Sequence, residues 1–141
     1  MYHQIDDNIE NGQTALSLAA GAGHVSVVEY LLQRKANLNH VTHSGISALS
    51  AAALNGHLSV CELLVKRGAS LRTSARSGPV RCAALNDHAT VCRFLLENGG
   101  DSSELISYFE PESAYDRARR CNSKPILEIC YDVRCSTRAA L

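Results

Sequence analysis

The amino-acid sequence predicts an all-α solenoid, in which short helix pairs stack side by side. Three observations carry this prediction. The 141 residues include 18 Ala and 17 Leu but two Phe and no Trp, so small and medium aliphatic side chains have to form the core. Gly12, Gly45 and Gly78 are spaced by 33 residues, which indicates an internal repeat. Within each period the apolar residues recur at helical spacing.

Each period is expected to form two short helices that share a single buried face. The first half is repeated almost intact, since the segment from Gly12 to His24 matches the segment from Gly45 to His57. The second half carries apolar residues at i, i+1, i+4 and i+5, which lie on one stripe of a helix. These residues are Val27, Val28, Leu31 and Leu32 in the first unit, Val60, Cys61, Leu64 and Val65 in the second, and Val91, Cys92, Leu95 and Leu96 in the third.

A 33-residue period with Gly-x-Thr-Ala-Leu-x-x-Ala-Ala, then Gly-His, then Val-Val-x-x-Leu-Leu resembles the ankyrin repeat. The resemblance covers residues 12–103 and implies three repeats, at 12–44, 45–77 and 78–103. The third repeat is two residues short and lacks the hydroxyl that would cap its first helix. Residues 1–11 are expected to form an extended N-terminal lead, and residues 104–141 a C-terminal helical cap or a degenerate fourth repeat.

Single residues mark the ends of these helices. Thr14 and Ser47 are expected to cap the first helix of their repeats through the side-chain hydroxyl. Gly68 and Gly99 can end the second helix in the left-handed conformation. Lys35 stands at the same position, where that conformation costs about 1 kcal/mol.

The first helix pair has too little sequence ahead of it for a complete unit. A solenoid of three units is near the minimum for stability, so its stability depends strongly on how the outer faces of its two end units are covered. We therefore expect Leu16 and Leu18 to be exposed unless another unit or a partner covers them, and the chain to be part of something longer.

Two further helices are predicted beyond the last repeat, over residues 111–120 and from Ser123 onward. The apolar stripe of the second helix consists of Ile126, Ile129, Cys130 and Val133. This stripe favours a helix that packs against the last repeat and closes the stack. The same segment loosely resembles the elongin-binding box that follows ankyrin arrays in some substrate receptors of cullin-RING ubiquitin ligases, because Ile126 lies four residues before Cys130. Arg134 departs from that pattern, in which an apolar residue is usual at this position.

The charge distribution bears on the class of partner. Fourteen basic and fourteen acidic residues cancel, so the chain lacks the basic field of a nucleic-acid-binding protein. No apolar run is long enough for membrane insertion, and the first residues lack the pattern of a secretory signal, which favours a cytoplasmic or nuclear location. Residues 65–94 carry six basic residues against Asp87 alone, so we expect a protein or peptide partner with an acidic stretch.

The motifs of catalysis, cofactor binding and metal binding do not occur in the sequence. His24, His57 and His88 recur at one repeat position, so a structural hydrogen bond to a loop is expected of them rather than a place in an active site. The six cysteines form no Cys-x-x-Cys pair and are expected to be reduced, buried thiols. We therefore expect a protein that is not an enzyme and that needs neither cofactor nor metal.

The positions at which the units differ indicate where a partner binds. In ankyrin-like arrays the hairpin tips and the exposed side of the first helices form a concave surface, and here they carry Gln13, Val41, His43, Ser44, Ile46, Leu54, Asn55, Ser74, Arg76, Ser77, Leu85 and Asn86. Variation on one face is typical of a surface that selects a partner, although drift on a solvated face leaves the same pattern. The expected apolar anchors are Val41, Ile46, Leu54 and Leu85, with Arg72, Arg76 and Arg81 at the rim.

Overall fold

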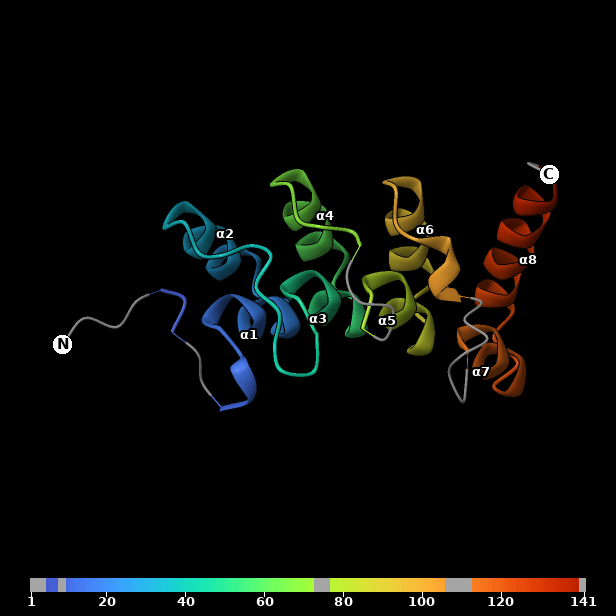
Figure 1. The fold of residues 1–141 in the computed structure, drawn as a ribbon, viewed down its shortest axis with the longest axis horizontal. Coiled ribbons are helices and arrows are strands. Elements are labelled where there is room, and N and C mark those ends of the chain that lie inside the picture. The colour runs from blue at the N-terminus through green and yellow to red at the C-terminus, as the bar shows by residue number, and fades with distance from the viewer. Residues whose placement is uncertain (1–4, 8–9, 73–76, 106–112, 140–141) are drawn as a thin grey trace.

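The structure is a computed structural model that describes residues 5–7, 10–72, 77–105 and 113–139. In this part of the chain eight α-helices form four successive pairs that lie in a row, with the two termini at opposite ends (Figure 1). The pairs are α1 (Ala15–Ala22) with α2 (Val25–Gln33), α3 (Ala48–Leu54) with α4 (Leu58–Lys66), α5 (Pro79–Leu85) with α6 (Ala89–Glu97), and α7 (Ala114–Arg120) with α8 (Lys124–Ala139). The predicted all-α solenoid is confirmed.

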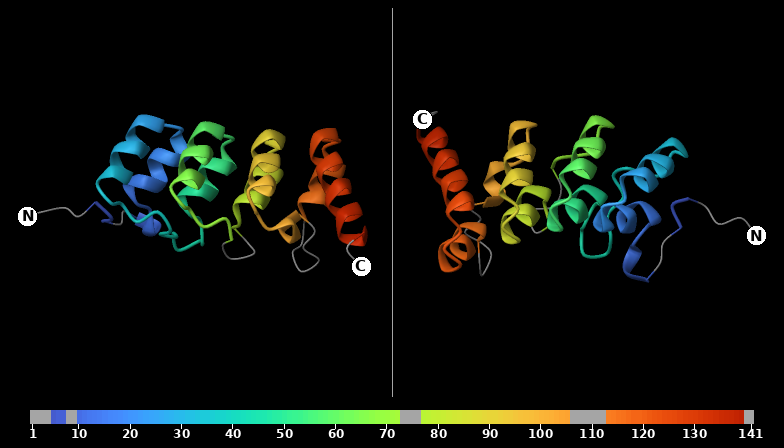
Figure 2. Two further views of the ribbon diagram at one scale, coloured as in Figure 1. Left: turned by 90° about the horizontal axis from the view of Figure 1, so that it is seen from above. Right: turned by 180° about the vertical axis from the view of Figure 1, so that it is seen from behind.

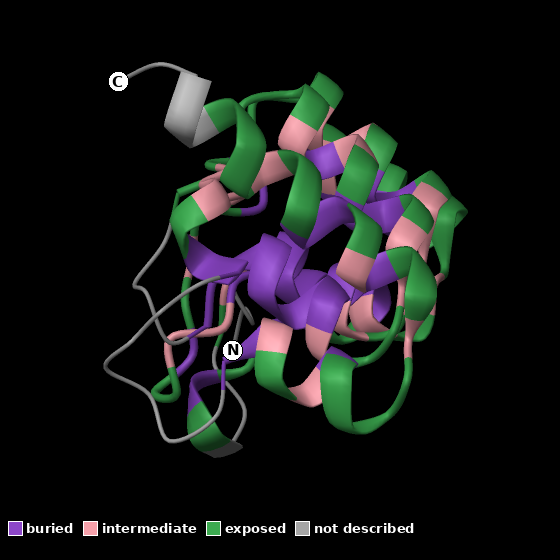
Figure 3. Ribbon diagram, turned by 90° about the vertical axis from the view of Figure 1, so that its right-hand side faces the viewer, coloured by how far each residue is buried: buried purple, intermediate pink, exposed green. Residues whose placement is uncertain are grey.

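The helices form two rows, with α1, α3, α5 and α7 in one row and α2, α4, α6 and α8 in the other (Figures 1 and 2). Helices of the first row approach closely because alanines stand at their contacts. Ala20, Ala52, Ala53 and Ala83 are all fully buried. The buried residues gather along the centre of the stack, and the exposed residues lie on its outside (Figure 3). The excess of Ala and Leu in the sequence is thus a consequence of this packing.

The turn inside each pair has the same backbone geometry. Its central residue takes a left-handed conformation, with φ angles of 78° at Gly23, 73° at Gly56, 63° at Asp87 and 54° at Asn122. The residue after it donates its N–H to a carbonyl oxygen five residues earlier, over 2.8–3.0 Å in all four pairs. The pair α7–α8, which the sequence pattern hardly marks, therefore has the turn of a fourth unit.

Helix α5 begins differently from the other helices of its row. In α1, α3 and α7 the side-chain oxygen before the helix accepts a hydrogen bond from the N–H three residues later, over 3.1–3.2 Å, and the accepting residues are Thr14, Ser47 and Ser113. Gly78 takes this place before α5 and offers no side chain. The carboxylate of Glu104 fills the position instead, and it accepts a hydrogen bond from Arg81 N at 2.9 Å. A Cβ atom on Gly78 would overlap that carboxylate.

The two residues that the third repeat lacks are missing from the loop ahead of α5. Helices α5 and α6 begin ten residues apart, as do α3 and α4, so the helix pair itself is complete. Because Gly78 takes the place of Thr14 and Ser47, the equal spacing of Gly12, Gly45 and Gly78 does not reflect equivalent positions. That part of the sequence alignment was wrong by two residues.

The ends of the second helices agree with the expectation from the sequence. The left-handed residues that follow α2, α4 and α6 are Lys35 (φ 63°), Gly68 (φ 90°) and Gly99 (φ 96°). Lys35 therefore carries the strain of about 1 kcal/mol that a side chain costs there. In the last pair, α7 begins at Ala114 rather than at residue 111, and Pro111 and Glu112 lie outside the described residues.

The N-terminal lead is joined to the first hairpin. Asn37 N donates a hydrogen bond to Asp6 Oδ1 at 2.7 Å, and Glu10–Gly12 forms a 3₁₀ turn ahead of α1. The expectation for Leu16 was wrong, because this side chain is 1% exposed and belongs to the core. Leu18 is 42% exposed, as expected.

Candidate functional site

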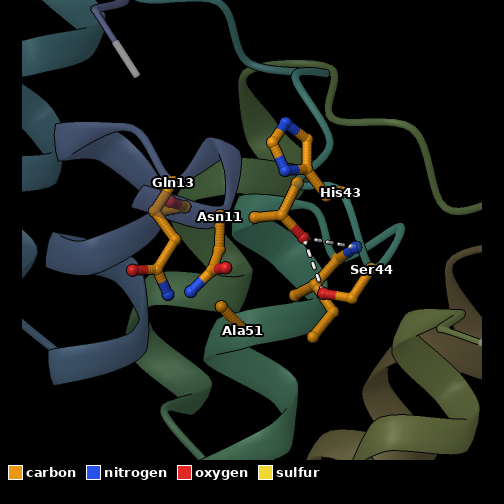
Figure 4. Close-up of a pocket in the computed structure, with 8 residues that line it drawn as sticks. Asn11, Gln13, His43, Ser44 and Ala51 are labelled. Carbon is orange, nitrogen blue, oxygen red and sulfur yellow. Dashed lines mark hydrogen bonds between the residues drawn. The ribbon is translucent and has the colours of Figure 1, made fainter. Parts of the chain in front are cut away.

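A cavity of about 460 Å³ opens between two successive hairpins, beside α1 and α3. In Figure 4, Asn11 and Gln13 line one side of this cavity and Ser44 the other, with Ala51 of α3 between them. The residues that line it are Asn11, Gln13, Ser17, Thr42, His43, Ser44, Ile46 and Ala51. None of them is an Asp, Glu, Lys or Arg, so the cavity offers hydrogen-bond donors and acceptors without a formal charge.

One wall of the cavity is a hairpin that is held in place by its own hydrogen bonds. Thr42 N donates to Ile46 O at 3.0 Å, and Ile46 N donates back to Thr42 Oγ1 at 3.1 Å. The Thr42 hydroxyl also pairs with Ser44 Oγ at 3.0 Å. Since these bonds form within the chain, the wall is organised before a ligand arrives.

The other wall is the segment Asn11–Gln13, which is tied to that hairpin. His43 N donates to Asn11 O at 3.1 Å, and His40 Nε2 lies 2.9 Å from Gly12 O. Gly12 has a φ of 75°, and a Cβ atom there would lie 2.9 Å from the His43 ring. A glycine is therefore needed for the two walls to approach this closely.

Four of the residues that the sequence assigned to partner binding line this cavity. Gln13, His43 and Ser44 are exposed, and Ile46 is half-buried. Val41 is 45% exposed on the same hairpin but does not line the cavity.

The other predicted residues are not gathered there. Leu85 and Asn86 line a second cavity of about 230 Å³, which also includes Arg117 and Cys121. Leu54 and Asn55 line neither cavity. The four expected apolar anchors therefore do not form one continuous anchor site.

Three of the predicted residues join neighbouring units. Asn55 and Asn86 are exposed, yet they donate their side-chain amides to carbonyl oxygens of the preceding unit, at 2.9 and 2.7 Å. Ser77 is buried and donates to Ser44 O at 2.8 Å. A partner would have to compete with these internal bonds.

The arginines of the expected rim differ in their placement. Arg72 is exposed, whereas Ser74 and Arg76 lie outside the described residues. Arg81 was expected at the rim, but it is 8% exposed. It stands on α5 at the position of the buried residues Ser17 and Ser50, so its side chain is directed into the stack.

The sequence analysis missed Asn11, Ser17, Thr42 and Ala51 as lining residues. Asn11 could have been found, because it lies 33 residues before Ser44 and therefore takes the same place on the preceding hairpin. Thr42 and Ala51 carry no such signal, since buried hairpin residues and helix alanines recur throughout the repeats.

His57 and the buried cysteines have structural surroundings. His57 Nε2 lies 3.1 Å from Gly21 O of the preceding unit, which is the structural contact expected at this repeat position. Burial raises the pKa of Cys61 and Cys92 to about 12, so these thiols stay protonated. Cys121 and Cys135 are exposed, contrary to the expectation of buried thiols throughout. The described residues include no cluster of three side chains that could hold a metal ion.

The two residues that resemble an elongin contact lie inside the stack. Ile126 and Cys130 are both 0% exposed and belong to the core. The exposed residues of α8 include Tyr131 and Arg134, and the Arg134 guanidinium stacks on the ring of Tyr115 at 4.8 Å.

Stacked helix pairs joined by hairpins, with a groove between the hairpins, define a helical repeat protein of the solenoid class. The family described as ankyrin repeats (3 copies) matches residues 2–75, and the chain belongs to this family, which is a protein-interaction fold. The match ends before α5, although α5–α6 and α7–α8 have the same turn geometry. No curated protein matches the chain. None of the helices in the described ranges is long and apolar enough to cross a membrane.

Proposed function

We propose that the protein is a non-enzymatic interaction module, or scaffold, that captures a segment of a partner protein in its hairpin groove. The hairpin groove is the cavity lined by Asn11, Gln13, His43, Ser44 and their neighbours. One observation carries the proposal: residues that vary between the repeats come together around a cavity whose backbone is already fixed. A preorganised site loses little conformational entropy when it binds.

The groove chemistry favours an extended peptide segment. The carboxamides of Asn11 and Gln13 each donate and accept hydrogen bonds, which suits the N–H and C=O groups of a peptide backbone. Ile46 and Ala51 offer the apolar contact that a small aliphatic side chain would fill. An acidic stretch in the partner belongs to the same proposal, and its support is the exposed Arg72 on the following hairpin.

The test is a selection of peptides from a random displayed library on the purified chain, followed by binding measurements on the selected peptides. We compare the wild type with the double variant Gln13→Arg/Ser44→Arg, in which two exposed groove residues become bulky and charged. We expect the variant to bind the selected peptides at least tenfold more weakly, because the arginines fill the groove.

The matched control is the double variant Ser26→Arg/Ser59→Arg, which adds the same charge at exposed positions of α2 and α4. This control should bind the peptides as the wild type does, and circular dichroism should show equal helix content in all three proteins. Equal affinity of the groove variant and the wild type would place binding elsewhere.

Recruitment of elongin through α8 is the alternative proposal from the sequence, and it would make the protein a receptor of a cullin-RING ubiquitin ligase. It is less favoured, because Ile126 and Cys130 would have to leave the core before they could contact elongin. The same binding measurement includes elongin subunits at micromolar concentration, at which the groove proposal expects no association.

A cytoplasmic or nuclear location belongs to the proposal as well. Its support is the exposed thiols of Cys121 and Cys135, since reducing compartments keep such thiols free. Binding of protein rather than nucleic acid follows from the balanced charge of the chain.

A further inference from the structure

The second cavity, of about 230 Å³, lies at the last junction of the stack, between α5 and α7. The residues that line it belong to the C-terminal halves of these helices and to the turns that follow them. The two earlier junctions of this row lie between α1 and α3 and between α3 and α5, and their turns have the same backbone geometry. The three junctions therefore differ at this place in their side chains rather than in their fold.

An asparagine side chain occupies this place at each of the two earlier junctions. Asn55 Nδ2 donates to Gly21 O at 2.9 Å, and Asn86 Nδ2 donates to Leu54 O at 2.7 Å. Both acceptors belong to the last turn of a first-row helix, where the helix itself provides no partner for the carbonyl oxygens. A primary carboxamide thus satisfies the helix end at both junctions.

An imidazole ring fills the neighbouring space at the same two junctions. His57 lies against Gly23, and His88 lies against Gly56, so closely that a Cβ atom on either glycine would lie 2.5–2.6 Å from the ring. His57 Nε2 also lies 3.1 Å from Gly21 O. At the first junction the ring and the asparagine carboxamide therefore meet the same oxygen and lie next to each other.

Smaller side chains stand at both positions of the last junction. Cys121 replaces the asparagine, and Ser123 replaces the histidine. The Ser123 hydroxyl donates to the Asp87 carboxylate. Leu85 O is the carbonyl oxygen that an asparagine would bond here, and no side chain among the described residues donates to it. The cavity therefore takes the space that a carboxamide and an imidazole fill at the earlier junctions.

Arg117 adds a positive charge to the cavity wall. It is half-buried on α7 and stands at the position that Ala51 has on α3. A guanidinium group only donates hydrogen bonds, whereas the carbonyl oxygen of Leu85 only accepts them. A carboxylate cannot donate and an ammonium group cannot accept, but a primary carboxamide does both from two different atoms. It is also the group that makes the corresponding bond at the two earlier junctions.

We propose that this cavity binds the side-chain carboxamide of a glutamine or asparagine residue of a partner polypeptide. The amide nitrogen donates to Leu85 O, and the amide oxygen accepts from the Arg117 guanidinium. The side chain enters from solvent, since Asp87 and Cys121 on the cavity wall are exposed. A polypeptide is the source because the chain belongs to a protein-interaction fold. The cavity shares no residue with the hairpin groove, and neither proposal depends on the other.

The test is a titration of the isotope-labelled chain with a capped tripeptide, acetyl-Gly-Gln-Gly-methylamide, which carries one primary carboxamide. The amide NMR signals of residues around the cavity, such as Asn86, Asp87 and Cys121, should shift with the peptide concentration. The corresponding leucine and glutamate tripeptides are similar in size and should bind about tenfold more weakly, because neither side chain donates to Leu85 O. Free L-glutamine is the remaining probe and should bind no more tightly than the glutamine tripeptide.

Two variants at one position test where the carboxamide binds. Cys121→Asn supplies the group that the earlier junctions have, so it should donate to Leu85 O and weaken binding of the glutamine tripeptide by about tenfold or more. The matched control Cys121→Ala has no donor and leaves the cavity open, so its affinity should equal that of the wild type. Circular dichroism should show equal helix content in all three proteins.

The proposal is overturned by equal affinity for the glutamine and leucine tripeptides, or by unchanged affinity of Cys121→Asn. Signals that shift only around the hairpin groove, or that do not shift at tens of millimolar peptide, overturn it too. Tighter binding of free L-glutamine than of the tripeptide would identify a free amino acid as the ligand and would also contradict the proposal.

Discussion

At the scale of single residues, neighbouring units are joined by a contact between their inter-helix turns. The left-handed residue of one turn lies against the residue that directly follows the left-handed residue in the turn of the next unit. In the first two junctions an imidazole lies against a glycine, as His88 does against Gly56. In the last junction Ser123 replaces the histidine and Asp87 replaces the glycine, and the Ser123 hydroxyl donates to the Asp87 carboxylate. The smaller serine leaves room for the larger turn residue, so the two departures from the repeat compensate for each other.

The first prediction concerns this contact. Gly56→Ala should lower the free energy of unfolding by about 2–3 kcal/mol, because the left-handed backbone disfavours alanine and the new Cβ displaces His88. Urea unfolding followed by circular dichroism measures the change.

The control is Gly68→Ala, at a position with a φ of 90° and no atom within 4 Å of the new Cβ. It should lose only the backbone cost of about 1 kcal/mol. Equal losses in the two variants would show that the histidine moves aside without cost.

The residue scale also marks a limit of the sequence analysis. Asp87 is visible in the sequence as a departure from the repeat, because it stands where Gly23 and Gly56 stand. Its partner Ser123 could not be assigned, since it lies 36 residues away in a segment where the repeat is no longer visible. The compensation appears only when both residues are placed in the fold.

At the scale of elements, α5 depends on a cap from another part of the chain. The other helices of its row are capped by the residue directly ahead of them, and the sequence predicted two of these caps, Thr14 and Ser47. The Glu104 cap of α5 lies 23 residues after the N–H that it accepts. No local pattern predicts such a cap, because it depends on how the segment after α6 returns to the stack.

The second prediction follows from the burial of this carboxyl group. Burial raises the pKa of Glu104 to about 7, above its ordinary value of 4.5. Between these two pH values the folded state holds a proton that the unfolded state has released, so the stability contribution is present at low pH and is lost as the pH rises toward 7. The free energy of unfolding should fall by up to about 3 kcal/mol over this range from Glu104 alone.

The measurement compares urea unfolding of the wild type and of Glu104→Gln at several pH values from 4.5 to 7.5. Glutamine keeps an oxygen that can accept from Arg81 N but does not titrate. The wild-type stability should fall relative to that of the variant as the pH rises. Two parallel curves would mean that Glu104 does not change its protonation in this range.

At the scale of the whole molecule, the place of a unit in the stack decides what its side chains contribute. Val27 and Val60 hold the same position in successive repeats, yet the first is 47% exposed and the second fully buried. Val60→Ser should therefore cost about 2–4 kcal/mol of stability, and Val27→Ser less than about 0.5 kcal/mol. Denaturation of both variants gives the comparison, and a large loss at Val27 would indicate that this side chain is covered in solution.

The overall arrangement was the most predictable part of the molecule. Spacing between equivalent residues such as His24 and His57 was enough to give the order of the first three units, whereas the sequence left the last pair open between a cap and a degenerate fourth repeat. The hairpin groove was predicted in part, because Gln13, His43, Ser44 and Ile46 were named among the residues that vary. Ser77 and Asn86 were named on the same grounds but hold units together, since variation alone does not tell an interface with a partner from one inside the chain.

Among the described residues, most hydrogen bonds between units run in one direction along the stack. The later unit supplies the N–H or O–H group and the earlier unit the oxygen, as in the bonds from Asn55 to Gly21, from Asn86 to Leu54 and from Ser70 to Asn39. The solenoid thus has a chemical polarity, with donors directed toward its N-terminal end. A polypeptide that extends it at that end has to bring acceptors, and the carbonyl oxygens at the end of a helix are suited to meet them.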